Sequence, residues 1–98
     1  MKNERIEKIR SLLHKEVGVY LHSDLNLSDV QITRVLISPD LKKVKFMFVS
    51  VSENFKQGFE VEEFLNRNSR KIRKDLFRRL SLKRVPEFMF EYDRGYYL

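Results

Sequence analysis

The spacing of apolar residues switches between two periods along this chain of 98 residues, and the order of the switches limits its possible folds. Between residues 6 and 20, apolar side chains recur at steps of three and four, which is typical of one helix face. Residues 30–37 and 44–51 are rich in β-branched and aromatic residues, so each predicts a strand. A Ser-Pro-Asp sequence after the first of them predicts a short hairpin loop at residues 39–43.

Helical spacing returns after a connector that is expected at residues 53–58. A helix is predicted at residues 59–67, and its glutamates are expected near its start, where the helix dipole favours negative charge. These glutamates are Glu60, Glu62 and Glu63. A third helix is predicted at about residues 69–80, with Asn68-Ser69 as its N-cap.

Strict alternation of apolar and polar residues predicts the last strand at residues 87–92, beyond Pro86. The order helix, strand, strand, helix, helix, strand indicates an α+β fold with one layer of helices and one of sheet. Strand aromatics could stack on RNA bases if they were exposed, whereas helices that cover one sheet face would bury them. The alternation favours a core position for Phe46, Phe48, Phe88, Phe90 and Tyr92.

Length and composition favour a single domain, residues 1–98, that works in the cytoplasm. The chain has no cysteine, which excludes disulfides and thiolate chemistry and is consistent with a reducing compartment. No stretch approaches the ~20 apolar residues of a membrane span. The N-terminal sequence also lacks the apolar segment of a secretory signal, so no membrane partner is expected.

Positive charge is concentrated in residues 67–84, which we call the basic segment. It holds nine of the twenty Lys and Arg residues and one acid, Asp75, so the rest of the chain carries a small net negative charge. Because a concentrated field of one sign attracts polyanions, the basic segment indicates a nucleic-acid partner. Apolar residues recur within it, which indicates a folded helix and not a solvated tail.

Basic and apolar residues occupy different faces of the predicted third helix. On a helical projection Ile72, Leu76 and Leu80 share one face. The other face carries Arg70, Lys71, Lys74 and Arg78. Arg73 falls on the apolar side, where it could either pair with an acid such as Asp93 or contact RNA, and the sequence favours neither.

No pattern of catalytic or metal-binding residues emerges from the sequence. His14 and His22 lie eight residues apart on one helix without a cysteine beside them, which does not make a metal site. The chain has no phosphate-binding loop of the Gly-x-x-x-x-Gly-Lys type and no motif that would activate a serine. We therefore expect no enzyme activity, no cofactor and no small-molecule substrate.

Three stretches of the chain resemble motifs of the ribosome-binding factor A family, a bacterial family of factors for maturation of the small ribosomal subunit. They are VLISPDLKKVKF at residues 35–46, KIRKDL at residues 71–76 and LKRVPEFMFEYD at residues 82–93. The resemblance covers nearly the whole chain, and the order and spacing of the three stretches fit as well.

The resemblance implies a type II KH-like domain with a mixed three-stranded sheet, helices on one face and a third strand parallel to the first. It also implies binding to the free small (30S) subunit and its 16S rRNA during late maturation, and an association with growth in the cold. Typical KH domains carry a Gly-x-x-Gly loop between two helices, and this chain has none.

The junction of the two helices departs from the family as well. Where the family has an Ala-x-Gly kink, this chain has Asn68-Ser69-Arg70. Either a cap followed by a new helix replaces the kink, or the two helices meet at a different angle.

The candidate RNA-binding residues are the cations of the basic segment: Arg67, Arg70, Lys71, Arg73, Lys74, Arg78, Arg79, Lys83 and Arg84. Each is expected to contact phosphate, so removing several should weaken binding broadly and flatten its salt dependence. Two alternatives share these electrostatics: an adaptor that docks an acidic protein, and a generic binder of single-stranded RNA or DNA. The missing Gly-x-x-Gly loop argues against the second, and a monomer is expected.

Overall fold

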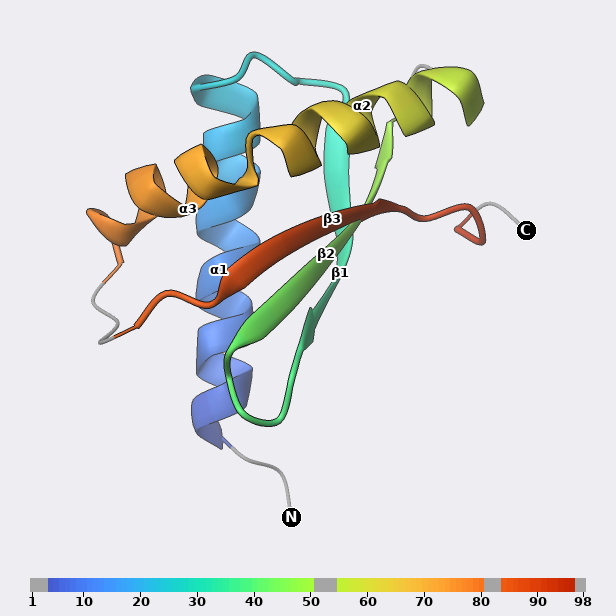
Figure 1. The fold of residues 1–98 in the computed structure, drawn as a ribbon. Coiled ribbons are helices and arrows are strands. Elements are labelled where there is room, and N and C mark those ends of the chain that lie inside the picture. The colour runs from blue at the N-terminus through green and yellow to red at the C-terminus, as the bar shows by residue number, and fades with distance from the viewer. Residues whose placement is uncertain (1–3, 51–54, 81–83, 97–98) are drawn as a thin grey trace.

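The structure, a computed structural model, describes residues 4–50, 55–80 and 84–96 (Figure 1). Its elements are α1 (Glu4–Ser23), β1 (Val30–Ile37), β2 (Lys43–Ser50), α2 (Phe55–Arg67), α3 (Ser69–Phe77) and β3 (Glu87–Tyr92). The predicted α+β class and the order of elements are confirmed, and β1 and β3 have the predicted bounds. The second strand begins one residue earlier than predicted, and residue 51 lies outside the described residues.

The three strands form one mixed sheet in the order β1-β2-β3. β1 is antiparallel to β2 and β3 is parallel to it, so Val44 pairs with Ile37 on one side and Phe88 on the other. The mixed sheet is confirmed. The expectation that the third strand runs parallel to the first is wrong, because β3 adds to β2 and therefore runs against β1. The two helices between β2 and β3 provide the long crossover that a parallel pair requires.

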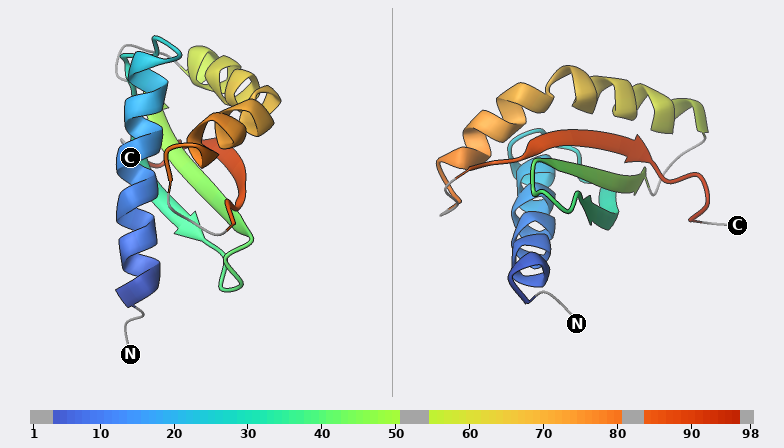
Figure 2. Two further views of the ribbon diagram at one scale, coloured as in Figure 1. Left: turned by 90° about the vertical axis from the view of Figure 1, so that its left-hand side faces the viewer. Right: turned by 60° about the horizontal axis from the view of Figure 1, so that its bottom comes forward.

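The core lies between one sheet face and the three helices, with α1 along β1 and α2 and α3 along β3 (Figure 2). The strand aromatics Phe46, Phe48, Phe88, Phe90 and Tyr92 are all at most 5% exposed, so their predicted core position is confirmed. The Phe46 ring contacts those of Phe88 and Phe90 at centroid distances of 5.0 and 5.3 Å. Because these rings fill the core, they are not available to stack on bases.

Helix side chains bind the backbone along both outer strands of the sheet. At β1, His22 Nε2 donates to the Val30 carbonyl at 2.6 Å, and His14 binds another carbonyl of the same strand. At β3, Asn66 binds both backbone groups of Phe90, with its Nδ2 donating and its Oδ1 accepting at 2.8 Å. Because unpaired strand edges attract further strands, these contacts protect the sheet.

Helix α2 begins at Phe55, so the expected connector at residues 53–58 is wrong over its last four residues. Gly58 lies inside the helix, where an added Cβ would be 2.6 Å from the Tyr92 ring, so close packing requires glycine there. The early start leaves no acid in the first turn, and the dipole role expected for the three glutamates is wrong. One of them, Glu62, instead accepts the Tyr92 N–H at 2.8 Å.

A single non-helical residue, Asn68, separates α2 from α3. Its N–H donates to the Phe64 carbonyl at 3.1 Å and its carbonyl accepts the Ile72 N–H at 3.0 Å, so helical bonding continues across the break. Asn68 stands at the N-cap position of α3 as predicted, but its side chain donates to the Phe64 carbonyl and makes no cap hydrogen bond to α3. The kink therefore forms without glycine, and α3 ends at Phe77, three residues before the predicted end.

Candidate nucleic-acid interface

Helix α3 turns its apolar side chains into the core and its cations toward solvent. Ile72 and Leu76 are fully buried, whereas Lys71, Lys74 and Arg78, just beyond the helix end, are exposed. The predicted separation of the two faces is confirmed. Phe77 departs from it, because its side chain is 53% exposed and lies beside the cations.

Arg79 is bound within the protein. Its Nη2 donates to Asp24 Oδ2 at 2.8 Å, and its guanidinium lies 5.5 Å from the centre of the Tyr20 ring. This hydrogen bond to the Asp24 carboxylate is the main cause that raises the pKa of Arg79. The contacts join the turn after α3 to the end of α1, so Arg79 holds the two helices together.

The one acid of the basic segment takes part in the same junction of helices. Asp75 Oδ2 accepts the Tyr20 hydroxyl at 2.6 Å. Burial, and then this hydrogen bond, raise the pKa of Tyr20 to about 12, so the phenol stays neutral at physiological pH. Because the Asp75 carboxylate points toward α1, the exposed cations of α3 have no acid beside them on their own side of the helix.

Arg73 is also used by the fold. Its Nε and Nη2 donate to the Val85 carbonyl at 2.9 and 2.8 Å, which ties the segment before β3 to α3. The suggested pairing with Asp93 is wrong. Asp93 accepts the Thr33 hydroxyl at 2.7 Å and lies 3.8 Å from Arg34 Nε, so it binds groups of β1.

Arg67 represents an intermediate case. Its Nη2 lies 2.6 Å from Glu63 Oε1 one helical turn away, and both side chains are about 70% exposed. Exposed ion pairs of this kind contribute little, so Arg67 can exchange its partner at small cost. Lys83 lies outside the described residues.

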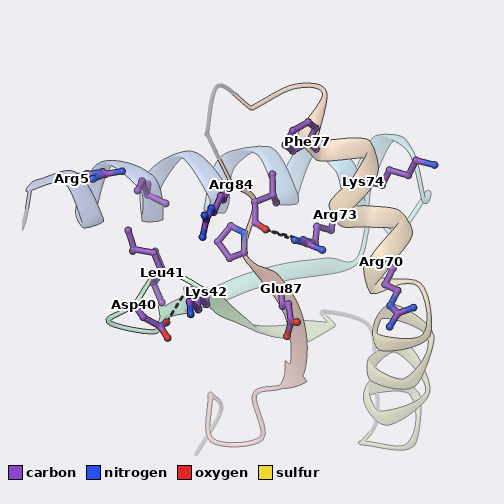
Figure 3. Close-up of a pocket in the computed structure, with 14 residues that line it drawn as sticks. Arg5, Asp40, Leu41, Lys42, Arg70, Arg73, Lys74, Phe77, Arg84 and Glu87 are labelled. Atoms are coloured by element: carbon purple, nitrogen blue, oxygen red, sulfur yellow. Dashed lines mark hydrogen bonds between the residues drawn. The ribbon is translucent and has the colours of Figure 1, made fainter.

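Four chain segments line an open pocket of about 860 Å³ beside the start of β3. It is lined by α1, the β1–β2 hairpin, α3 and the segment from Arg84 to Glu87. Figure 3 shows Arg5 and Arg70 at opposite ends of it, with Lys42 and Arg84 between them. The pocket therefore brings together cations from four separate parts of the chain.

The lining of the pocket is strongly positive. Its cations are Arg5, Lys42, Arg70, Arg73, Lys74 and Arg84, and its acids are Asp40 and Glu87. Asp40 is directed at its own turn, where it accepts the Ser38 hydroxyl at 2.7 Å and the Lys42 N–H at 3.0 Å. These bonds, the one from Ser38 foremost, lower the pKa of Asp40.

The structure divides the predicted candidates into three groups. Arg70, Arg73, Lys74 and Arg84 meet in the pocket. Lys71 and Arg78 are exposed outside it, and Arg67 and Arg79 are paired with carboxylates. Sequence reasoning missed Arg5 and Lys42. Lys42 could have been found if the third strand had been predicted to pair with the second. That pairing places Lys42 beside Glu87, whose N–H donates to the Lys42 carbonyl at 2.8 Å.

The described part of the chain offers neither a metal site nor a membrane-spanning helix. Residues 4–50, 55–80 and 84–96 contain no group of three or more His, Asp or Glu side chains that could hold a metal ion. None of the helices in these ranges combines the length and apolar character that crossing a membrane requires.

Sequence comparisons give the chain a family. Residues 5–97 match the family described as Ribosome-binding factor A. A protein of that name from Prochlorococcus marinus is 36% identical over 96 residues, which covers 93% of this chain and 73% of the relative. Another, from Coxiella burnetii, is 34% identical over 96 residues, covering 95% of this chain and 79% of the relative. The family resemblance carried by the three sequence motifs is confirmed.

Two solved structures share the fold. A solution structure from Thermotoga maritima, described as a candidate ribosome binding factor A, has a TM-score of 0.67 at 24% identity, covering 87% of each chain. A crystal structure of ribosome-binding factor A from Thermus thermophilus has a TM-score of 0.64 at 18% identity, covering 88% of this chain and 97% of the other. At these identities the likeness concerns the fold alone.

Proposed function

The chain belongs to the ribosome-binding factor A family, and from this premise we propose that it binds the free small (30S) ribosomal subunit and its 16S rRNA during late maturation. Membership itself implies the coarser role of a ribosome-binding factor in ribosome biogenesis. Proteins of this family are described as binding factors and not as enzymes. The proposed role needs recognition and release but no chemical step, and we propose that a monomer performs it in the cytoplasm.

The observation that carries the proposal is the group of cations that the fold leaves without a partner. Within the described ranges, no hydrogen bond or carboxylate holds the side chains of Arg70, Lys71, Lys74, Arg78 and Arg84. They extend over α3, the turn after it and the pocket. A group of unpaired cations on folded elements suits the phosphate backbone of RNA, because phosphate contacts release counterions.

We assign phosphate contact to these five residues and to Arg67, whose exposed ion pair is easily exchanged. Lys83 remains a candidate from the sequence. Arg73 and Arg79 act as positioning residues, because they are hydrogen-bonded to Val85 and Asp24 and hold α3 in place.

Co-sedimentation with free small subunits and with complete ribosomes, at two salt concentrations, tests the proposal. The wild-type protein is expected to bind free small subunits selectively, and binding should weaken as salt rises. Equal binding to both particles, or binding to neither, would contradict it.

A triple variant tests the assigned surface in the same assay. Replacement of Lys71, Lys74 and Arg78 by Ala should reduce the slope of the logarithm of the binding constant against the logarithm of salt concentration. The reduction should be about 0.7 to 0.9 for each phosphate that the variant no longer neutralises. The control replaces Lys8, Lys15 and Lys43, which removes the same charge from exposed positions of α1 and of the start of β2, outside α3 and the pocket. An equal decrease of affinity in both variants would contradict the assignment, and an equal affinity for an acidic polypeptide would favour a protein-binding adaptor.

A further inference from the structure

The lining of the pocket holds as many apolar residues as cations, and its two acids are Asp40 and Glu87. Beside its six cations stand six apolar residues, which are Ile9, Ile37, Leu41, Phe77, Val85 and Pro86. A surface that contacts only phosphates needs cations and gains nothing from an apolar wall. The ligand of this pocket should therefore carry negative charge and an apolar surface on the same small unit.

The Phe77 ring is the exposed part of this apolar wall. It is 53% exposed, while Ile72 and Leu76 on the same helix are fully buried. Arg70, Lys74 and Phe77 lie at steps of four and three residues, which places them in one row along α3. Two positive charges are thus followed by an aromatic face, the combination with which proteins hold single-stranded nucleic acid.

Other exposed phenylalanines lack this setting. Phe59 is 41% exposed, but it packs against the Tyr92 ring and lies below the Arg94 guanidinium. Phe64 is also 41% exposed, but it is not part of the pocket. Exposure alone is therefore common on this surface, and the position among pocket cations is what distinguishes Phe77.

The hairpin turn adds a second apolar group at an unfavourable backbone conformation. Leu41 has a positive φ of 61°, which glycine or asparagine adopts far more readily than a branched residue. The turn is fixed by the Leu41 N–H, which donates to the Ser38 carbonyl at 2.9 Å, and by the bonds of Asp40. Strain of this kind persists where the surrounding structure imposes it, often at a ligand site, and here it supplies an apolar side chain to the pocket.

We propose that this pocket binds an unpaired nucleotide of RNA, with the base against the Phe77 ring and its phosphates beside Arg70, Lys42 and Arg84. In a duplex the flat faces of the bases are stacked inside, and only sugars, phosphates and base edges face the protein. An unpaired nucleotide presents an unstacked base and a phosphate together. The pocket volume of about 860 Å³ lies within the usual range of ligand pockets, roughly 300–1,000 Å³. The inference rests on the proposed function and narrows it from rRNA in general to an unpaired site.

A binding assay with paired RNA probes tests the inference. One probe is a hairpin whose stem carries a single unpaired adenosine, and the other is the same stem without it. Phe77→Ala should weaken binding of the first probe roughly 5- to 150-fold, as for the removal of one base stack, and change binding of the second by less than about twofold. Phe77→Tyr, which keeps the ring, should bind both probes like the wild type.

Phe64→Ala is the matched control, since it removes a phenylalanine ring that is also exposed, at 41%, but lies outside the pocket. If Phe77→Ala and Phe64→Ala bind the two probes alike, the inference is wrong, while the proposed function stands provided that the wild type binds small subunits. If the wild type binds neither RNA nor subunits, the proposed function fails first.

Nuclear magnetic resonance of the methyl groups keeps the test independent of any variant. Adenosine monophosphate should shift the methyl signals of Ile37 and Leu41 in the pocket but not that of Leu36, which is 44% exposed on the other sheet face. Inorganic phosphate should shift them much less. Equal shifts with phosphate and with the nucleotide would mean a simple anion site and would overturn the inference.

Discussion

Arg78 and Arg79 are neighbours in sequence with the same charge, yet the fold binds only one of them. Arg79 donates to Asp24 at 2.8 Å and lies over the Tyr20 ring, while Arg78 extends into solvent without a partner in the described part of the chain. The same contrast separates Arg73, bound to the Val85 carbonyl, from Lys71. The basic segment therefore contains cations that hold the fold and cations that have no partner in the described part of the chain.

This division matters because a bound cation and an unbound one respond differently to a polyanion. An unbound cation releases a counterion when phosphate approaches, which is the source of salt-dependent affinity. A cation that already bridges two elements would have to give up its partner and loosen the fold. The net charge of the segment thus overstates the proposed binding surface, whose extent depends on which side chains already have partners within the protein.

The largest expected effect concerns Arg73, a cation that is bound within the fold. Arg73→Ala removes two charged hydrogen bonds from the carbonyl of Val85, a residue that is only 5% exposed. The free energy of unfolding should fall by about 2 kcal/mol, as measured by urea denaturation. Lys71→Ala is the control and should change it by less than about 0.5 kcal/mol. Similar decreases in the two variants would remove the distinction between the two kinds of cation.

The pH dependence of stability tests the junction between α1 and α3. The pKa of Tyr20 is raised from 10.0 to about 12 by burial and by the hydrogen bond to Asp75. Because the folded pKa is the higher one, the neutral phenol stabilises the fold below pH 10, and this contribution is lost as pH rises toward 12. Between these values the unfolding free energy of Tyr20→Phe should therefore decline less than that of the wild type. Parallel declines would show that the phenol makes no such contribution.

Removal of a single cation that has no partner within the fold should weaken RNA binding and leave the stability of the fold unchanged. Lys71→Ala should weaken binding to small-subunit RNA and lower the salt slope by the equivalent of about one phosphate, with an unchanged unfolding midpoint. Titrations at several salt concentrations measure this slope. Lys15→Ala, an exposed cation of α1, is the control and should leave the slope as it is.

The smallest effect is expected for the intermediate case, Arg67. Glu63→Gln removes the exposed carboxylate that lies 2.6 Å from the Arg67 guanidinium. Freed from this partner, Arg67 should bind phosphate slightly better, and the affinity for RNA should rise about twofold at low salt. A decrease of affinity would mean that Glu63 orients Arg67 for binding.

The fold could be predicted from the sequence where periodicity alone determines structure. Strands β1 and β3 have the predicted bounds because their apolar and β-branched patterns are clear. The start of α2 was missed because Gly58 is typical of a connector, whereas the Tyr92 ring 34 residues later requires it. Asn68 stands at the predicted N-cap position, but its side chain binds the Phe64 carbonyl of the preceding helix and does not cap α3. The error at Gly58 arose because a distant contact overrides a local signal.

The candidate site divides in the same way. The exposed face of α3 follows from helical spacing, and the structure confirms it. Which cations the fold binds depends on Asp24 and Val85, which come from other elements and have no spacing that marks them as partners. The pocket was missed for the same reason, since it forms only where β3 adds beside β2 and brings Lys42 near Arg84.

The most direct test compares the salt dependence of RNA binding for Arg78→Ala and Arg79→Ala, at a temperature where both variants are folded. The two substitutions remove the same charge one residue apart. Arg78→Ala should lower the salt slope by the equivalent of about one phosphate, and Arg79→Ala should leave it unchanged while lowering the unfolding temperature. Equal reductions of the slope would contradict the division of the basic segment, because charge alone would then determine binding.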